Sequence, residues 1–112
     1  MERKGILVAF SIKAGMIKTG SEKSKFFKAL YGWTQTVPKE KKTYSYYREG
    51  VLDEMPHVRV DQSSFIVPQE NFDDIMDFFG EWTNKVMLKT FQVLLDDETK
   101  DIFDEFQLEE DG

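Results

Sequence analysis

The residue types that could carry acid–base or metal chemistry gather in one short segment, DEMPH, at residues 53–57. It holds Asp53, Glu54 and His57, the only histidine of the chain. Carboxylates beside an imidazole could bind a metal ion or run general acid–base catalysis in a hydrolase. Pro56 interrupts a helix, so these side chains cannot line one helix face as zinc ligands often do. The alternative is a structural histidine, and the sequence favours no catalytic residue, no metal and no cofactor.

Other chemistry is limited by composition. The chain has no cysteine, which excludes thiol nucleophiles, zinc–thiolate sites and disulfides. The apolar run from Ile6 to Phe10 is too short for a signal segment or a membrane span. We therefore expect a cytoplasmic, non-catalytic protein without a membrane partner.

A second chemical pattern is the basic and aromatic stretch KKTYSYYREG, residues 41–50. In a strand, Tyr44, Tyr46 and Arg48 point to one side. Aromatic rings on an open sheet can stack on bases while cations hold phosphates. The sequence therefore predicts binding of single-stranded or structured nucleic acid. The predicted contacts are Trp33, Lys41, Lys42, Tyr44, Tyr46 and Arg48. The alternative is that the tyrosines only form cross-strand packing pairs.

Charge is distributed unevenly along the chain. Residues 1–50 hold 11 Lys/Arg and 4 Asp/Glu, or +7, and residues 51–112 hold 4 and 17, or −13, which gives the net −6. Nine of the last seventeen residues are acidic. Acidic–hydrophobic alternation is typical of partner-binding segments, so Ile102, Phe103 and Phe106 are predicted anchors for a protein partner or a second copy. The alternatives are a solubilising tail and a tail that covers the basic region as an internal competitor.

The elements that must position these residues follow from hydrophobic periodicity. Residues 5–12 predict a buried strand, and Phe26, Phe27, Leu30 and Tyr31 line one face of a following helix. Tyrosine- and threonine-rich strands around a PKEK turn follow, and then a strand, a second helix and a last strand.

This order predicts an α+β fold, a ferredoxin-like two-layer sandwich (βαββαβ) with an extra hairpin around residues 33–60. The predicted domain spans residues 1–95, and residues 96–112 form an acidic tail that is a short helix or disordered. Both helices should cover one face of the sheet. We expect the basic and aromatic stretch to lie on the other, open face.

Three segments also carry a resemblance. GILVAFSI, KFFKALYGWTQ and SSFIV resemble the first strand, the first helix with its Tyr-Gly step, and a Ser-Phe strand of the small CRISPR-adaptation endoribonucleases. The resemblance covers about half the chain and implies a ferredoxin-like fold and dimerisation. That family has a metal-binding aspartate at the end of the first strand, whereas this chain has Ser11 and Lys13 there. Nuclease activity is therefore not implied. The Lys- and Glu-rich composition with only two Asn resembles that of thermophilic archaeal proteins.

Overall fold

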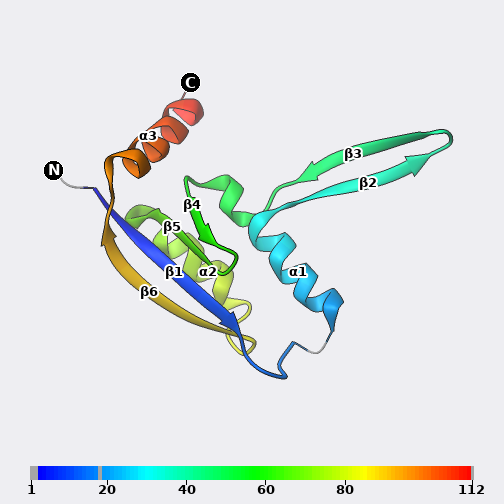
Figure 1. Ribbon diagram of the computed structural model, residues 1–112, viewed down its shortest axis with the longest axis horizontal. Coiled ribbons are helices and arrows are strands. Elements are labelled where there is room, and N and C mark those ends of the chain that lie inside the picture. Colours follow the sequence, from blue (N-terminus) through cyan, green and yellow to red (C-terminus); the bar gives the residue numbers. More distant parts are fainter. Residues whose placement is uncertain (1–2, 18, 112) are drawn as a thin grey trace.

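The computed structural model describes residues 3–17 and 19–111. Within these residues the fold is α+β, with three α-helices and six strands in two antiparallel sheets (Figure 1). No helix among them is both long enough and apolar enough to cross a membrane.

The larger sheet has four strands in the order β4-β5-β1-β6, and every neighbouring pair is antiparallel. The strands are β1 (Lys4–Ile12), β4 (Val58–Asp61), β5 (Ser64–Pro68) and β6 (Val86–Leu94). Side chains alternate between the two faces, so Ile6, Val8 and Phe10 of β1 point into the core. They lie in register with Val67 and Phe65 of β5 on the same face.

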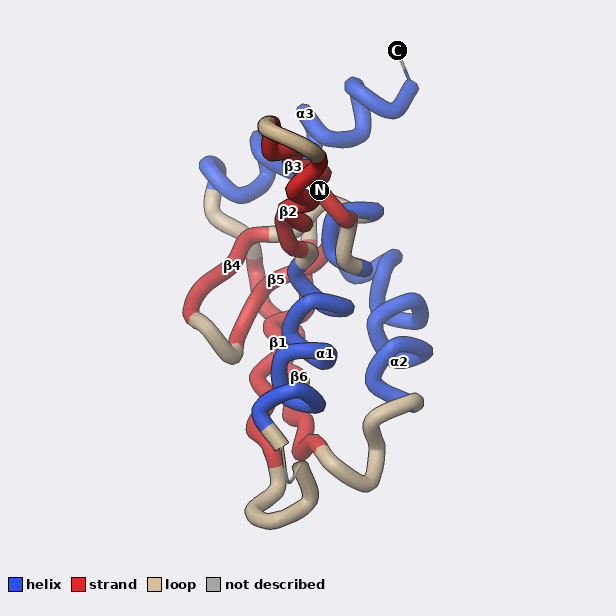
Figure 2. The backbone as a smooth tube through the Cα atoms, turned by 90° about the vertical axis from the view of Figure 1, so that its right-hand side faces the viewer, coloured by secondary structure: helices blue, strands red, loops and turns tan. Residues whose placement is uncertain are grey.

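Helices α1 (Gly20–Tyr31) and α2 (Phe72–Gly80) cover one face of this sheet and leave the other uncovered (Figure 2). Their buried residues, Phe26 and Leu30 on α1 and Ile75 and Phe79 on α2, join the inward strand residues in one core. Aromatic rings dominate it, with Phe10 at 5.5 Å from Phe26 between ring centroids. Thr19 caps the start of α1, because its hydroxyl accepts a hydrogen bond from the Glu22 amide at 3.1 Å.

The tyrosine-rich strands form a separate, two-stranded sheet. Strands β2 (Trp33–Lys39) and β3 (Lys42–Arg48) pair only with each other and project from the body as an arm (Figure 1). The expectation that this stretch lies on the open face of the main sheet is therefore wrong. The extra hairpin is residues 33–48, and its ends meet the body at the short helix η1 (Val51–Glu54) and at α1.

The acidic segment forms helix α3 (Asp97–Asp111), which follows β6 directly at the end of the sheet where β1 begins (Figure 1). A second short helix, η2 (Gln69–Asn71), precedes α2. Gly112 lies outside the described residues. A division of the chain after residue 95 stays a prediction.

Candidate nucleic-acid interface

The arm is a hairpin closed by the two-residue turn Glu40–Lys41. Glu40 has a φ of 55°, in the left-handed region that such short turns use. The register pairs Lys39 with Lys42 beside the turn and Trp33 with Arg48 at the base. Because directly opposed residues point to the same side of a sheet, this register fixes which side chains share a face.

One face of the arm carries all the aromatic and basic side chains of β2 and β3 except Tyr47. This basic-aromatic face consists of Trp33, Gln35, Val37, Lys39, Lys42, Tyr44, Tyr46 and Arg48. The opposite, polar face consists of Thr34, Thr36, Pro38, Thr43, Ser45 and Tyr47. Five of the six predicted contacts thus lie on a single face, and the sixth, Lys41, lies in the turn at its tip.

The two tyrosine rings of this face are solvent-exposed. Tyr44 is 42% exposed and Tyr46 is 47% exposed, and no residue of β2 or β3 belongs to the core cluster of the body. Arg48 is held beside the rings, since its Nε donates a hydrogen bond to Gln35 Oε1 at 2.8 Å and its guanidinium lies 5.8 Å from the Tyr46 centroid. Rings without a covering layer can accept a stacked base, and the fixed guanidinium can pair with a phosphate.

At its base the basic-aromatic face continues onto α1. The Lys28 ammonium lies 4.1 Å from the centroid of the Trp33 ring, a cation–π contact between helix and arm. A surface hollow of about 750 Å³ opens here, between α1 and the start of β2. Its lining is Gly20, Ser21, Ser24, Lys25, Lys28, Ala29, Trp33 and Glu49. The cations of this surface therefore lie in two groups, at the tip of the arm and at its base, where Lys25 and Lys28 of α1 join Arg48.

Two glycines form the neck of the arm, where the chain leaves and re-enters the body. A Cβ on Gly50 would lie 2.3 Å from the Gly32 nitrogen and 2.6 Å from the Leu30 carbonyl oxygen. Gly32 has a φ of 85°, and a Cβ there would lie 2.3 Å from the Tyr47 hydroxyl. The two segments can approach this closely only because neither residue has a side chain.

Tyr47 ties the neck to η1. Its hydroxyl donates a hydrogen bond to Asp53 Oδ2 at 2.6 Å, and the Gly50 amide donates to the same oxygen at 2.8 Å. The Tyr31 carbonyl oxygen lies 3.2 Å from the Tyr47 hydroxyl. The bond to Asp53 raises the pKa of Tyr47, because ionisation would place a phenolate against a carboxylate. These bonds set the direction in which the arm leaves the body.

The DEMPH segment has structural contacts. Asp53 accepts the hydrogen bonds of the neck described above, and His57 Nδ1 lies 3.1 Å from the Met55 carbonyl oxygen. Glu54 lines a different hollow, beside Asp74 of α2. Among the side chains that the structure describes, those of residues 3–17 and 19–106, no group of three His, Asp or Glu is placed to hold a metal.

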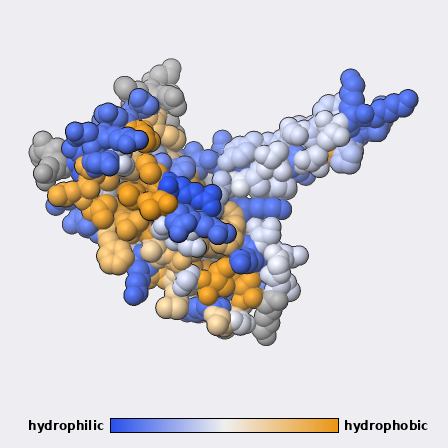
Figure 3. All heavy atoms as spheres, in the orientation of Figure 1, coloured by the Kyte–Doolittle hydropathy of each residue, from blue (hydrophilic) through white to orange (hydrophobic). Residues whose placement is uncertain are grey.

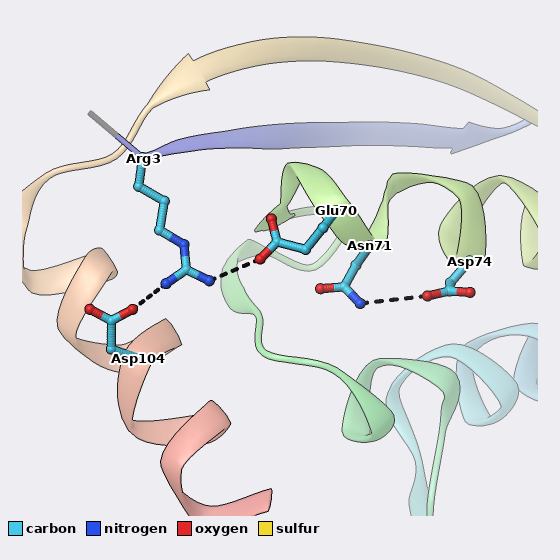
Figure 4. A network of polar contacts seen from close by, with 5 residues as sticks. All are labelled: Arg3, Glu70, Asn71, Asp74 and Asp104. Atoms are coloured by element: carbon cyan, nitrogen blue, oxygen red, sulfur yellow. Dashed lines mark hydrogen bonds and ion pairs between the residues drawn. The ribbon is translucent and has the colours of Figure 1, made fainter. Parts of the chain in front are cut away.

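The predicted partner anchors on α3 differ in exposure. Ile102 is 41% exposed, Phe106 is half-buried, and Phe103 is fully buried. The Arg3 guanidinium lies 5.6 Å from the Phe103 ring and forms ion pairs with Glu70 and Asp104 (Figure 4). Phe103 therefore packs within the chain and is not free to anchor a partner.

Figure 4 also shows the bond from Asn71 to Asp74 at the start of α2, 3.5 Å long. The arginine that links α3 to η2 could not be singled out from the sequence, because its partners lie 67 and 101 residues away. The role of Tyr47 was missed for a related reason. Alternation along β3 already sets Tyr47 on the opposite side from Tyr44 and Tyr46, but no local pattern indicates that its hydroxyl bonds to Asp53.

Comparison of the chain with protein-family models, with curated proteins and with solved structures found no match. The resemblance to the CRISPR-adaptation endoribonucleases therefore stays a hypothesis, and the function must be argued from the geometry.

Proposed function

We propose that this protein binds single-stranded or structured nucleic acid through the basic-aromatic face of the arm. The observation that carries the proposal is that the register gathers Trp33, Tyr44, Tyr46 and Arg48 on one face with no protein layer over it. The rings would stack on bases, and the cations would pair with phosphates. Lys25 and Lys28 would extend the contact along α1.

The net charge of −6 does not oppose this reading, because the acidic residues are concentrated in other elements. Residues 33–48 contain four cations and a single acidic residue, Glu40. Helix α3 carries most of the acidic tail and follows the far end of β6 (Figure 1). A basic arm on an acidic body concentrates the attraction for a polyanion at one place and limits contact elsewhere.

We also infer that the body is a ferredoxin-like sandwich into which the arm is inserted. With β2 and β3 set aside, the remaining elements follow the order βαββαβ, and the four strands are antiparallel with β1 and β5 in the centre. Both helices on one face support the same assignment (Figure 2).

The test is a fluorescence-anisotropy titration of labelled mixed-sequence RNA and DNA oligonucleotides at low salt. Tyr44→Ala with Tyr46→Ala should weaken binding at least tenfold, since stacking contributes about 1–3 kcal/mol per base. The matched control is Thr34→Ala with Thr36→Ala on the polar face, which should bind like the unchanged protein.

Salt dependence gives a second readout in the same titration. If Lys39, Lys41, Lys42 and Arg48 each contact a phosphate, log K should fall with log salt at a slope of about −2.8, and Lys41→Gln with Lys42→Gln should reduce it to about −1.4. No binding at low salt, or affinity unchanged by the tyrosine substitutions, would refute the proposal and leave the rings as packing pairs.

A further inference from the structure

The two edges of the main sheet differ in how they are protected from pairing with a further strand. At one edge, β4 has 4 residues and a register shift between Arg59 and Asp61. At the other, β6 has 9 residues in unbroken register with β1, no proline, and Lys89 as its single charged residue. Short strands, irregular register and charged side chains are the usual protection of a sheet edge. The β6 edge has little of this protection and is open to another strand.

The bonds to β1 identify which backbone groups of β6 face outward. The Lys13 amide donates to the Lys85 carbonyl oxygen at 2.8 Å, one residue beyond the β1–β6 pairing. Bonded pairs recur at every second residue of an antiparallel pair, so Met87 and the alternate residues after it bond to β1. The residues between them direct their amides and carbonyls away from the sheet. They are Leu88, Thr90 and Gln92. Within residues 3–17 and 19–111, no strand other than β1 pairs with β6.

An apolar hollow of about 460 Å³ lies beside this edge, between α2 and the start of β6. Its lining is Lys13, Met76, Phe79, Gly80, Thr83, Val86, Met87 and Leu88. Figure 3, drawn in the orientation of Figure 1, shows hydrophobic residues gathered over β1 and β6. Leu88 is opposite Phe10, so it faces the helix side of the sheet. A residue paired with Leu88 from outside would point the same way, towards the hollow.

The charges at this edge are positive. Lys89 is exposed and lies opposite Ala9, which places it on the uncovered face. Lys13 is the charged residue of the hollow, and its Nζ lies 3.1 Å from the Thr83 carbonyl oxygen. In the part of the chain that the structure describes, neither β6 nor the lining of the hollow includes an acidic side chain. Charge complementarity therefore selects a segment with an acidic residue over a basic one.

We propose that the β6 edge binds an extended acidic and apolar segment of a partner protein, which adds a strand to the main sheet. The outward amides and carbonyls require an extended backbone, and the hollow takes a large apolar side chain opposite Leu88. An acidic residue next to it lies opposite Lys89, whichever direction the added strand runs. The inference does not depend on nucleic-acid binding, because no residue of the arm belongs to this edge.

The test uses a synthetic peptide of about seven residues, an ordinary strand length. In it, valine and leucine alternate with threonine, and one aspartate follows the central leucine. Amide hydrogen exchange of the whole protein is measured by NMR with and without the peptide. Saturation should slow exchange at Leu88, Thr90 and Gln92 at least tenfold. Exchange at Lys89 and Phe91 should not change, because these amides already donate to β1.

Matched peptides and variants separate the backbone contribution from that of the side chains. N-methylation of the central leucine removes a donor to β6 and should weaken binding at least tenfold. Met76→Ser in the hollow and Lys89→Glu on the strand should each weaken it at least threefold. The control is Val60→Ser on β4, an exposed apolar residue at the opposite edge, which should bind like the unchanged protein. Circular dichroism verifies that each variant is folded.

Three results would overturn the proposal. One is the absence of binding up to about 1 mM peptide. The second is binding without the alternating protection, or binding that N-methylation does not weaken. The third is a free protein in which Leu88, Thr90 and Gln92 are already protected and light scattering gives twice the mass of 13.2 kDa. In that case a second copy of the chain, and not a partner segment, occupies the edge.

Discussion

The neck of the arm makes a strong prediction for Gly50→Ala. Gly50 has φ −94° and ψ 174°, values that alanine adopts without strain, so any cost must come from collision. The new Cβ would lie 2.3 Å from the Gly32 nitrogen and 2.6 Å from the Leu30 carbonyl oxygen. Both are backbone atoms, which cannot rotate away as a side chain can, so the two segments of the neck must separate.

The expected loss of stability follows from that geometry. Overpacking costs about 1–3 kcal/mol, and collision with backbone atoms places this variant near 3 kcal/mol. Urea denaturation followed by circular dichroism measures it. With an m-value of about 2 kcal/mol per M, the midpoint should fall by roughly 1.5 M.

Gly80→Ala is the matched control, because a Cβ there meets no atom within 4 Å. That variant should be unchanged or more stable by up to about 1 kcal/mol, as alanine is favoured over glycine in a helix. Equal urea midpoints for the two alanine variants would contradict the close approach of Gly50 to the backbone of Gly32 and Leu30.

Two further predictions concern the anchoring of the arm and of α3. The raised pKa of Tyr47 means that the Asp53 bond contributes fully below pH 10 and is lost as the pH rises through the folded-state pKa, so urea midpoints should fall above pH 10. In Tyr47→Phe the urea midpoint should fall less above pH 10. The remaining fall comes from Tyr31, because burial raises the pKa of that residue too. An identical pH profile in the two proteins would contradict the bond between Tyr47 and Asp53. Phe103→Ala should cost about 3–5 kcal/mol and speed amide exchange along α3, whereas Ile102→Ala, at an exposed position of the same helix, should change little. Equal effects of the two substitutions would show that Phe103 does not hold α3.

Much of the body could be predicted because burial leaves a periodic trace in the sequence. The continuous apolar run from Ile6 to Phe10 predicted β1, and the spacing of Phe26 and Leu30 predicted α1. Both predictions succeed because each element packs one face on a common core, and this constraint appears in the residue pattern of a short segment.

The position of the arm could not be predicted from a local residue pattern. The tyrosine and threonine content predicts that residues 42–48 form a strand, but it does not specify which strand they pair with, because backbone hydrogen bonds are the same for every partner. One signal was available. Neither face of β3 carries an aliphatic side chain, whereas β1, β5 and β6 bury Ile, Val and Phe side chains in the core with α1 and α2.

Five of the predicted contacts nonetheless share a face, because the period of two holds in any sheet. The pairing of Arg3 with Glu70 and Asp104 depends on tertiary distances that no local pattern encodes.

The meeting of Gly32 and Gly50 also means that the polypeptide enters and leaves the arm at a single point. The core of the body contains no residue of β2 or β3, so the arm between these two glycines does not contribute to it. Lengthening an inserted segment of this kind adds only about 0.6 kcal/mol of loop-closure free energy for each doubling of its length. The packing of the body therefore does not limit the length of the arm. Arms of different length could thus be carried by the same folded body.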